Sequence, residues 1–238
     1  MVNVNTLIEG CKDLDIQLTD KQISKFTLYK ELLLEWNQKI NITAIEDEEE
    51  IDIKHFLDSL TILKTGLFKK GVKIIDIGTG GGFPGLPLKI VDDSIDLVLL
   101  DSLKKRIKFL DEVINSTNLD SAIAIHGRAE DYGQDKLYRE GFDIATSRAV
   151  ASWDILCEYS LPFVKGGGYF IAMKGKEIDE ELKEAEKAIK ILGGEVVDKL
   201  LVEVPNSNIV HSLIICKKVS ETPTKYPRQA GKPKKNPL

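Results

Sequence analysis

The sequence predicts a doubly wound α/β fold, in which helices cover both faces of a mostly parallel sheet. Short, dense apolar runs of strand length recur from Val72 onward, and segments with apolar residues at helical spacing separate most of them. The last two runs follow one another too closely for a helix to lie between them, so they predict a hairpin with one antiparallel strand. The expected sheet has seven strands, and a helical segment precedes it.

The segment 1–65 is predicted to be helical. Thr19 and Gln22 form the T-x-x-Q pattern of a capping box, which marks the start of a helix. Apolar residues then follow at helical spacing, at Ile23, Phe26, Tyr29, Leu33, Trp36 and Ile40. After an acidic stretch (46–50), the segment HFLDSLTIL (55–63) predicts a second helix.

The seven strand candidates differ from this region in their dense apolar composition. In chain order they are KIIDIG (73–78), SIDLVLLD (94–101), SAIAIHG (121–127), FDIATSRAV (142–150), GGYFIAMKG (167–175), EVVDKLLVEV (195–204) and IVHSLIICKK (209–218). Two helices between them are marked by apolar faces, one at Leu103, Ile107, Leu110 and Ile114 and one at Ile178, Leu182, Ala185, Ile189 and Leu192. Gly193 and Gly194 are expected to end the second of these helices.

The C-terminal segment 222–238 has a different composition. It holds four prolines and almost no periodicity, so we expect an extended tail that forms neither a helix nor the interior of a strand. The tail has no acidic residue and five basic ones: Lys225, Arg228, Lys232, Lys234 and Lys235. Because the whole chain has a net charge of −5 and the tail contributes +5, the segment 1–221 carries −10, and the tail is expected to have an anionic partner. The expected organisation is a helical segment (1–65), an α/β core (66–221) and the tail.

Composition argues against several classes of protein. Hydrophobic and charged contents of 42% and 30% are typical of a globular chain that can bury a core. No apolar run approaches the roughly 18–20 residues of a membrane helix, and the N-terminus lacks the features of a signal peptide. The cysteines and histidines are scattered, at Cys11, Cys157 and Cys216 and at His55, His126 and His211. We therefore expect a cytoplasmic protein without a metal site or disulfides.

The strongest local signal is the glycine-rich segment DIGTGGGFPG (76–85) at the end of the first strand. Doubly wound sheets bind ligands at this edge, and glycines let the backbone approach a ligand closely. From Gly80 the segment matches G-x-G-x-x-G, but its first glycine comes too late after the strand for a dinucleotide site. The carboxylate of Asp76 would repel a pyrophosphate and attract a cation, which favours a sulfonium cofactor with a free amino group. The alternative is a tight turn that binds nothing.

Acidic residues also follow the second and third strands. Asp101 ends the strand that comes after the glycine-rich segment, and it can accept hydrogen bonds from both ribose hydroxyls of a nucleoside. Its alternative role is to cap the next helix, although Ser102 can do so. The loop GRAED (127–131) can flank a purine, whose edge a backbone N–H and a neighbouring carboxylate can read. On its own, this loop would be interpreted as solvated.

Together these three elements resemble the cofactor site of class I S-adenosylmethionine-dependent methyltransferases. Nearly the whole chain further resembles the RsmG (GidB) family of 16S rRNA guanine-N7 methyltransferases. The matching segments are LYKELLLEWNQKINITAI (28–45), HFLDSL (55–60), DIGTGGGFPGLPLKI (76–90), HGRAED (126–131), FDIATSRAVA (142–151) and YPRQAGKPKKNPL (226–238). The resemblance implies a Rossmann-like class I methyltransferase fold, S-adenosyl-L-methionine as cofactor, and 16S rRNA as partner, in the form of a small-subunit ribonucleoprotein. The cofactor-binding residues that it implies are Gly78, Gly80, Phe83, Asp101, Ala129, Glu130 and Arg148.

Arg148 closes the fourth strand, at the edge where a methyl donor and its target must meet. Its guanidinium can hold the methionine carboxylate, a phosphate or guanine O6, or it can be a surface residue. The following sequence, SRAV (147–150), is not the N-P-P-Y-like motif of adenine amino-group methylation, and no cysteine follows a proline as in cytosine C5 methylation. Guanine N7 carries a lone pair and no proton, so in-line placement suffices and we name no catalytic residue.

The tail is interpreted as an RNA-binding arm. Basic residues interleaved with prolines and Tyr226 can follow phosphates in an extended conformation, and the tail matches the ending of the family. The alternative is a solvated end. The expected RNA-binding residues are Arg148, Lys225, Arg228, Lys232, Lys234 and Lys235. The helices of the segment 1–65 either help to hold the substrate or only cover the sheet.

Two other functions stay open at the level of sequence. A small-molecule methyltransferase would share the cofactor loop but would not need the basic tail. A non-enzymatic ribosome-assembly factor would be expected to have a degraded cofactor loop, whereas Asp76, the glycines and Asp101 are all present. Transfer of labelled methyl groups to RNA separates these functions from the first.

Overall fold

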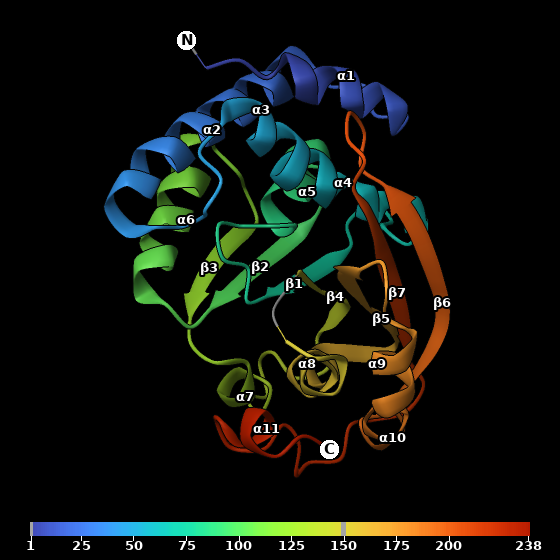
Figure 1. The fold of residues 1–238 in the computed structure, drawn as a ribbon. Helices are drawn as coiled ribbons and strands as arrows, with labels where there is room; N and C mark the ends of the chain where they lie inside the picture. Colours follow the sequence, from blue (N-terminus) through green and yellow to red (C-terminus); the bar gives the residue numbers. More distant parts are fainter. Residues whose placement is uncertain (1, 149–150) are drawn as a thin grey trace.

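The computed structural model describes residues 2–148 and 151–238, which form a seven-stranded sheet with helices on both faces (Figure 1). The strands are β1 (Lys73–Ile77), β2 (Asp96–Asp101), β3 (Ala122–His126), β4 (Phe142–Arg148), β5 (Val164–Gly175), β6 (Gly194–Glu203) and β7 (Val210–Lys218). β7 runs antiparallel to its neighbours β5 and β6, and the other pairs are parallel. The predicted sheet is confirmed; residues 149–150 of its fourth strand lie outside the described residues.

The order of the strands places a ligand crevice at the centre of the sheet. The order is β3-β2-β1-β4-β5-β7-β6, so the chain leaves β1 toward β2 on one side and returns to β4 on the other. Side chains of β1 are buried on both faces: Ile74 joins one hydrophobic cluster, and Ile75 and Ile77 join the other. Doubly wound sheets bind ligands at the carboxyl ends of the strands where the order reverses, here between β1 and β4.

Helices from the N-terminal segment cover one face together with two helices of the core. They are α1 (Asn5–Asp13), α2 (Asp20–Ile40), α5 (Gly85–Val91) and α6 (Lys104–Ser116). The predicted capping box is confirmed: the Gln22 N–H donates to the Thr19 hydroxyl, and the Thr19 N–H donates to the Gln22 side chain. The N-terminal segment and the core thus share one hydrophobic cluster.

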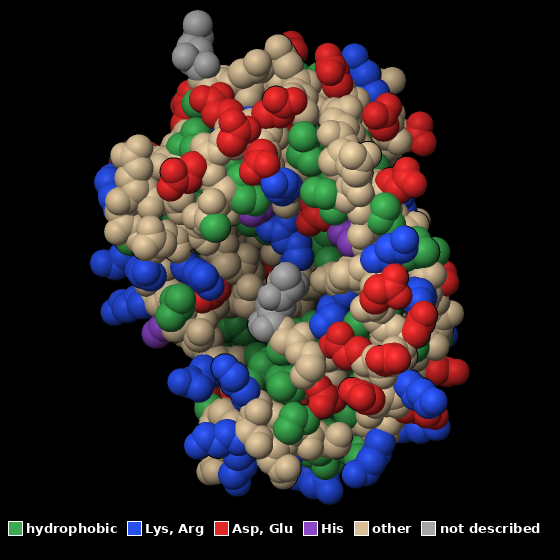
Figure 2. All heavy atoms as spheres, viewed as in Figure 1, with side chains coloured by type: hydrophobic (Ala, Val, Ile, Leu, Met, Phe, Trp, Pro, Cys, Tyr) green, Lys and Arg blue, Asp and Glu red, His purple; other side chains and the backbone are tan. Residues whose placement is uncertain are grey.

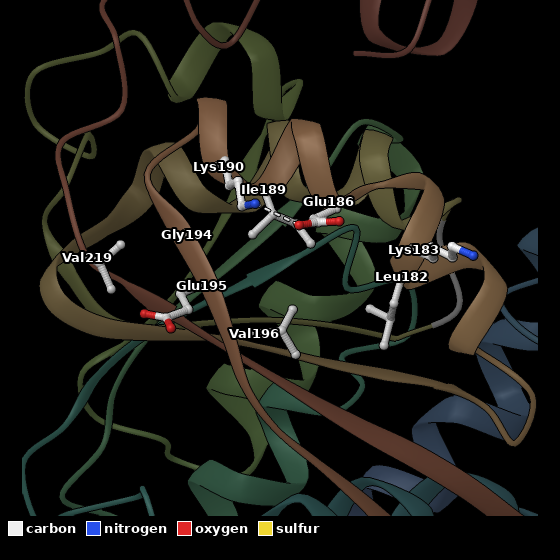
Figure 3. Close-up of a pocket in the computed structure, with 9 residues that line it drawn as sticks. All are labelled: Leu182, Lys183, Glu186, Ile189, Lys190, Gly194, Glu195, Val196 and Val219. Carbon is white, nitrogen blue, oxygen red and sulfur yellow. Dashed lines mark hydrogen bonds and ion pairs between the residues drawn. The ribbon is translucent and has the colours of Figure 1, made fainter.

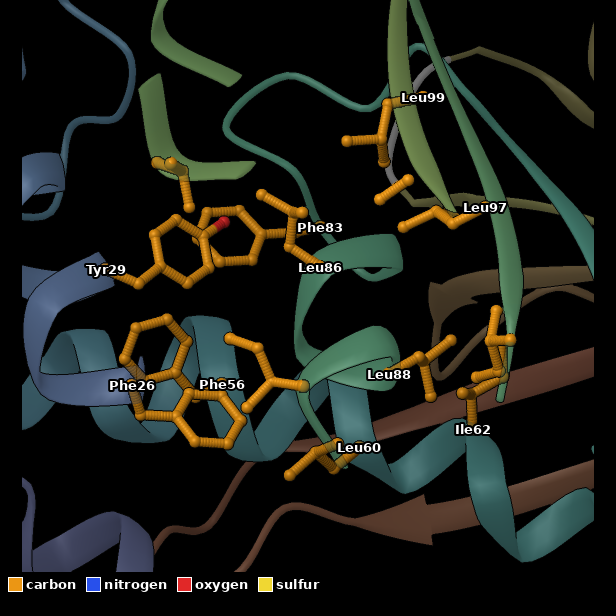
Figure 4. Close-up of a cluster of buried hydrophobic side chains, with 14 of the residues drawn as sticks. Phe26, Tyr29, Phe56, Leu60, Ile62, Phe83, Leu86, Leu88, Leu97 and Leu99 are labelled. Atoms are coloured by element: carbon orange, nitrogen blue, oxygen red, sulfur yellow. The ribbon is translucent and has the colours of Figure 1, made fainter. Parts of the chain in front are cut away.

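Aromatic side chains join α2 to the glycine-rich loop. Tyr29 packs against Phe56 and Phe83, with ring centres 5.2 and 5.6 Å away, and Phe26 packs against Phe56 at 5.1 Å (Figure 4). The Tyr29 hydroxyl also donates a hydrogen bond to the carbonyl of Gly81. The N-terminal segment therefore supports the loop directly.

The helix predicted at 55–63 follows an irregular course. The chain passes through α3 (Glu48–Ile51), the π-helix η1 (Asp52–Leu57), α4 (Asp58–Leu60) and the 3-10 helix η2 (Thr61–Thr65). In the π-helix, Asp52 pairs with the buried amine of Lys30 at 2.6 Å. Single π-helical turns occur often at functional sites, and this one holds His55 beside the sheet. The polar partners of this π-helical turn come from distant parts of the chain, so the spacing of apolar residues does not predict it.

The helices on the other face follow the second half of the chain. They are α7 (Ala129–Tyr132), α8 (Trp153–Ser160), the 3-10 helix η3 (Leu161–Phe163), α9 (Asp179–Glu184) and α10 (Glu186–Ile191). The single helix predicted over 178–192 is divided into α9 and α10 at Ala185, whose side chain is buried. Its predicted end is confirmed, because Gly193 follows with φ of 83°.

The tail (222–238) packs along α7 and α8 (Figure 1). The expectation that it forms no helix is wrong, because Lys232–Lys235 form the short helix α11. Pro233 lies in its first turn, where the missing N–H of proline costs no hydrogen bond. Arg228 holds the tail in place by pairing with the buried carboxylate of Glu158 at 2.6 Å. A buried carboxylate is costly without such a partner.

Within residues 2–148 and 151–238, no helix has the length and hydropathy to cross a membrane. The same residues contain no group of three or more His, Cys, Asp or Glu side chains placed to bind a metal ion. The three cysteines are buried and form no disulfide.

Candidate functional site

The glycine-rich loop connects β1 to α5 at the point where the strand order reverses. Gly78, Gly80 and Gly82 have φ of 67°, 62° and 99°, a region that other residues rarely adopt. A Cβ atom added at Gly80 would meet no atom nearer than 4.0 Å, so open space lies above the backbone there. The loop presents bare backbone to that space, as the close approach of a ligand requires.

Asp76 holds this loop from within the protein. One of its carboxylate oxygens accepts hydrogen bonds from the Thr79 hydroxyl at 2.7 Å and from the Gly85 N–H at 2.9 Å. Complete burial raises the pKa of the carboxyl to about 6, although both hydrogen bonds act to lower it. Asp76 lines neither of the cavities at the strand ends, so the expectation that its carboxylate faces a cationic cofactor is not met. Asp76 therefore stabilises the conformation of the glycine-rich loop.

Asp101 ends β2 and connects three segments. One oxygen accepts from the Gly80 N–H at 3.0 Å and pairs with Arg106 at 3.2 Å. The other oxygen accepts from the Leu103 N–H at 2.8 Å. Leu103 takes the N-cap position of α6 with no side-chain capping bond, so neither Ser102 nor Asp101 caps the helix. The Asp101 carboxylate instead orients the glycine-rich loop.

Two adjoining cavities open at these strand ends, with volumes of about 500 and 230 Å³. Gly78, Asp101 and Ser102 lie in the walls of both, and we call the pair the switch-point cavity. All seven residues expected to bind a cofactor line it: Gly78, Gly80, Phe83, Asp101, Ala129, Glu130 and Arg148. The fold thus brings together the glycine-rich loop and the ends of β2, β3 and β4.

Arg148 ends β4 and is anchored by the N-terminal segment, so its interpretation as a surface residue is wrong. Its Nη1 donates to the Asp58 carboxylate at 2.7 Å and to the Lys54 carbonyl at 2.9 Å. Its Nη2 lies 3.1 Å from His55 Nδ1, and its guanidinium stacks 4.9 Å from the ring centre of Phe83. Burial, together with the charge of Arg148, lowers the pKa of His55 to about 3, so a neutral imidazole accepts the hydrogen bond.

Asp58 and His211 are site residues that sequence reasoning missed. His211 Nδ1 lies 2.7 Å from an Asp58 oxygen, and His211 Nε2 lies 2.9 Å from the Thr61 hydroxyl. Burial acts to raise the pKa of Asp58, but hydrogen bonds from His211 and Arg148 and their charges lower it below its usual value. The contact forms only when β7 comes to lie beside β5, so no local spacing indicates it. The one available signal is the HFLDSL segment of the family resemblance.

The basic residues of the tail fall into two groups. The Nε and Nη2 atoms and the backbone N–H of Arg228 all donate to Glu158, so this residue is engaged inside the protein. The remaining four are exposed: Lys225, Lys232, Lys234 and Lys235. The tail also reaches the switch-point cavity, because the Gly231 N–H donates to the carboxylate of Glu130 at 2.9 Å.

Sequence reasoning also missed a group of basic residues at the start of α6. Lys104, Lys105 and Lys108 are exposed there, directly after the strand that carries Asp101. Figure 2 looks onto the hollow at the strand ends, with basic side chains along its left and lower left sides and acidic ones gathered above and to the right. This side of the molecule therefore suits an anionic partner.

A different cavity, of about 510 Å³, lies between α9, α10 and β6 (Figure 3). Leu182, Ile189 and Val196 give it an aliphatic wall, and Glu186 and Lys190 form an ion pair beside it at 2.6 Å. β6 is an edge strand of the sheet, far from the point where the strand order reverses. None of the residues expected to bind a cofactor lines this cavity, so the switch-point cavity is the candidate site.

Comparisons with known proteins show which proteins this chain is similar to. The family model "GidB: rRNA small subunit methyltransferase G" matches residues 22–210. A protein of Alkaliphilus oremlandii (strain OhILAs) named ribosomal RNA small subunit methyltransferase G is 57% identical, over 98% of this chain and 97% of its own length. A protein of the same name from Thermoanaerobacter sp. (strain X514) is 53% identical, over 99% of this chain and 98% of its own length.

Solved structures share the fold at low sequence identity. A SAM-dependent methyltransferase from Aquifex aeolicus matches with a TM-score of 0.54 and 19% identity, over 75% of this chain and 97% of that one. A mutant of MtNAS matches with a TM-score of 0.55 and 15% identity, over 84% of this chain and 75% of that one. These matches bear out the predicted Rossmann-like fold.

Proposed function

Because this chain belongs to the GidB family, rRNA small subunit methyltransferase G, we propose that it methylates guanine N7 in 16S rRNA with S-adenosyl-L-methionine as methyl donor. One observation of the structure carries the proposal: all seven residues expected to bind the cofactor line two cavities at the strand ends that share Gly78, Asp101 and Ser102 in their walls. A loop that had lost its ligand would have no reason to keep this arrangement.

The residues of the switch-point cavity suit S-adenosyl-L-methionine. Gly80 leaves room for the amino-acid end against bare backbone, and Gly78 lines the same cavity. Asp101 lies at the junction of the two cavities, where its carboxylate can accept hydrogen bonds from ribose hydroxyls. Ala129 and Glu130 line the smaller cavity, which suits the purine. The bound donor supplies a methyl group activated by its sulfonium.

The proposed reaction requires the protein mainly to place the target base and the methyl donor correctly. The N7 lone pair of guanine bonds to the methyl carbon, the carbon–sulfur bond breaks toward sulfur, and the positive charge passes to the purine. No proton moves, so no acid, base or nucleophile is required. The protein contributes alignment of the reacting atoms and a suitable electrostatic environment. The reaction also requires no metal.

We propose the small-subunit ribonucleoprotein as the physiological form of the substrate and the cytoplasm as the place of reaction. Basic side chains gather along one side of the hollow in Figure 2, and the exposed lysines of α6 and of the tail can neutralise phosphates around a target nucleotide. A small metabolite would not need charges spread over so wide a surface. This distribution favours RNA over the small-molecule alternative.

The direct test is transfer of tritiated methyl groups from S-adenosyl-L-methionine to unmethylated small subunits, followed by digestion to nucleosides. We expect the label in 7-methylguanosine derived from 16S rRNA. Label in another nucleoside would contradict the proposed target atom. Absence of label in RNA would favour a small-molecule methyltransferase or an assembly factor without activity.

A further inference from the structure

A second large cavity lies on the other side of Arg148 from the switch-point cavity. Its volume is about 660 Å³, within the usual range for sites that hold small ligands. Met173, Gly175 and Val210 are among the residues that line it, at the end of β5 and the start of β7. Arg148 and His55 line both this cavity and the larger part of the switch-point cavity. Only a shared wall of side chains separates the two spaces.

We propose that this second cavity, here called the acceptor cavity, receives the target guanosine after it has turned out of the RNA. The inference rests on the proposed function and deepens it, because it states where the methylated nucleoside lies. Enzymes that modify a base commonly take the nucleotide out of its stack and hold it in a pocket. A base in the acceptor cavity can direct one edge past Arg148 toward the methyl group.

The hydrogen-bonding capacity of Arg148 explains why guanine is the base selected. Among the described residues, three of its five N–H groups are used, by Asp58, the Lys54 carbonyl and His55. The other two can donate to guanine O6, which lies next to N7 on the same edge. Adenine presents an amino donor at that position, so an arginine N–H would face an N–H group. Adenine is thereby disfavoured at the site.

The charge balance of this wall also suits the reaction. The carboxylate of Asp58 contacts both Arg148 and His211, at 2.7 Å each. It offsets the charge of the guanidinium beside a purine that becomes positive as it accepts the methyl group. Asp58 and His211 line the acceptor cavity and are absent from the walls of the switch-point cavity. Asp58 orients the guanidinium of Arg148 directly, and His211 acts on it only through Asp58.

Gly175 offers a clean way to fill the acceptor cavity. It ends β5 and lines this cavity, and a Cβ there would meet no atom within 4 Å on a backbone outside the left-handed region. Gly166, near the start of the same strand, meets the same two conditions and lines none of the cavities described above. Gly175→Leu and Gly166→Leu thus add the same side chain to one strand at similar cost to folding.

The test compares the two variants with the wild type. For each we would measure kcat/KM for methylation of small subunits and Kd for S-adenosylhomocysteine. We expect Gly175→Leu to lower kcat/KM at least tenfold with Kd changed less than twofold, and Gly166→Leu to change neither. If Gly175→Leu does not fold, as judged by thermal melting, Val210→Phe fills the cavity from the neighbouring strand β7 and is expected to behave in the same way.

The outcomes separate this inference from the proposed function. Wild-type activity with an equally active Gly175→Leu variant would overturn the acceptor cavity and leave the proposed function intact. A wild-type protein that transfers no methyl group to guanine N7 would overturn the proposed function and the inference with it. Loss of S-adenosylhomocysteine binding in a folded Gly175→Leu variant would also overturn it, because the cavity would then belong to the methyl donor.

Discussion

Arg148 shows how a single side chain joins the two parts of the protein. It ends a strand of the core, but its hydrogen-bonding partners Lys54, His55 and Asp58 belong to the N-terminal segment. The π-helical turn η1 brings two of these residues to the strand end. The N-terminal segment therefore does more than cover the sheet: it orients a residue that lines both cavities.

Asp76 provides a prediction about pH at the same scale. Its pKa in the folded protein is raised to about 6, above the usual 3.8, so the folded state binds this proton more tightly than the unfolded state. The resulting stability is fully present below about pH 4 and is lost as pH rises through about 6. In Asp76→Asn the amide oxygen can still accept from Thr79 and Gly85, but this titration is gone.

We therefore expect the free energy of unfolding of the wild type to fall, relative to that of Asp76→Asn, as pH rises from 5 to 7.5. The difference should be on the order of 1 kcal/mol, since one pKa unit corresponds to about 1.4 kcal/mol. Urea unfolding of both proteins at the two pH values, without cofactor, measures it. Asp52, whose pKa is also raised to about 6, titrates in both proteins, so its contribution to the pH dependence cancels in the comparison. The same pH dependence in both would refute this account of Asp76.

The tail is an element with two separate tasks. Arg228 and Gly231 fix it to Glu158 and Glu130, whereas its four exposed lysines face solvent. Deletion of the segment 222–238 would uncover the buried Glu158 carboxylate and disturb the cavity wall at Glu130. Truncation would therefore remove both the packing contacts and the exposed charges of the tail. Substitution of the lysines alone removes the charges and leaves the packing contacts in place.

Replacement of Lys225, Lys232, Lys234 and Lys235 by Gln should weaken RNA binding in a salt-dependent way. Each phosphate contact contributes about −0.7 to −0.9 to the slope of log K against log salt, so the slope should flatten by up to roughly 3. Cofactor affinity should not change, because the tail stays in place. A matched control removes four exposed lysines elsewhere, Lys12, Lys183, Lys187 and Lys190. Equal slopes for the two variants would show that the tail does not contact phosphates.

Elements that depend on local signals were predictable from the sequence, and those that depend on distant contacts were not. Residues close in sequence determine the strands, the capping box at Thr19 and the end of α10 at Gly193. The π-helical turn, the division at Ala185 and the pairing of Asp58 with His211 arise from tertiary packing. The resemblance to the family named the seven residues expected to bind the cofactor, and their grouping around one cavity was predictable because parallel strands bring their carboxyl ends together.

At the scale of the whole molecule, charge and shape agree on one functional face. The segment 1–221 carries a net charge of −10, yet basic side chains gather along one side of the hollow at the strand ends (Figure 2). An acidic body repels RNA elsewhere, and a basic border attracts it to the cavities. The two cavities then lie side by side beneath the bound RNA, with Arg148 between them.

A crystal structure of the protein with S-adenosylhomocysteine and a guanosine nucleotide tests this arrangement most directly. We predict the ribose of S-adenosylhomocysteine against Asp101, its purine beside Ala129, and the guanine beside Gly175, with N7 facing the sulfur past Arg148. S-adenosylhomocysteine bound outside the switch-point cavity, or a guanine lodged anywhere other than the acceptor cavity, would contradict the account.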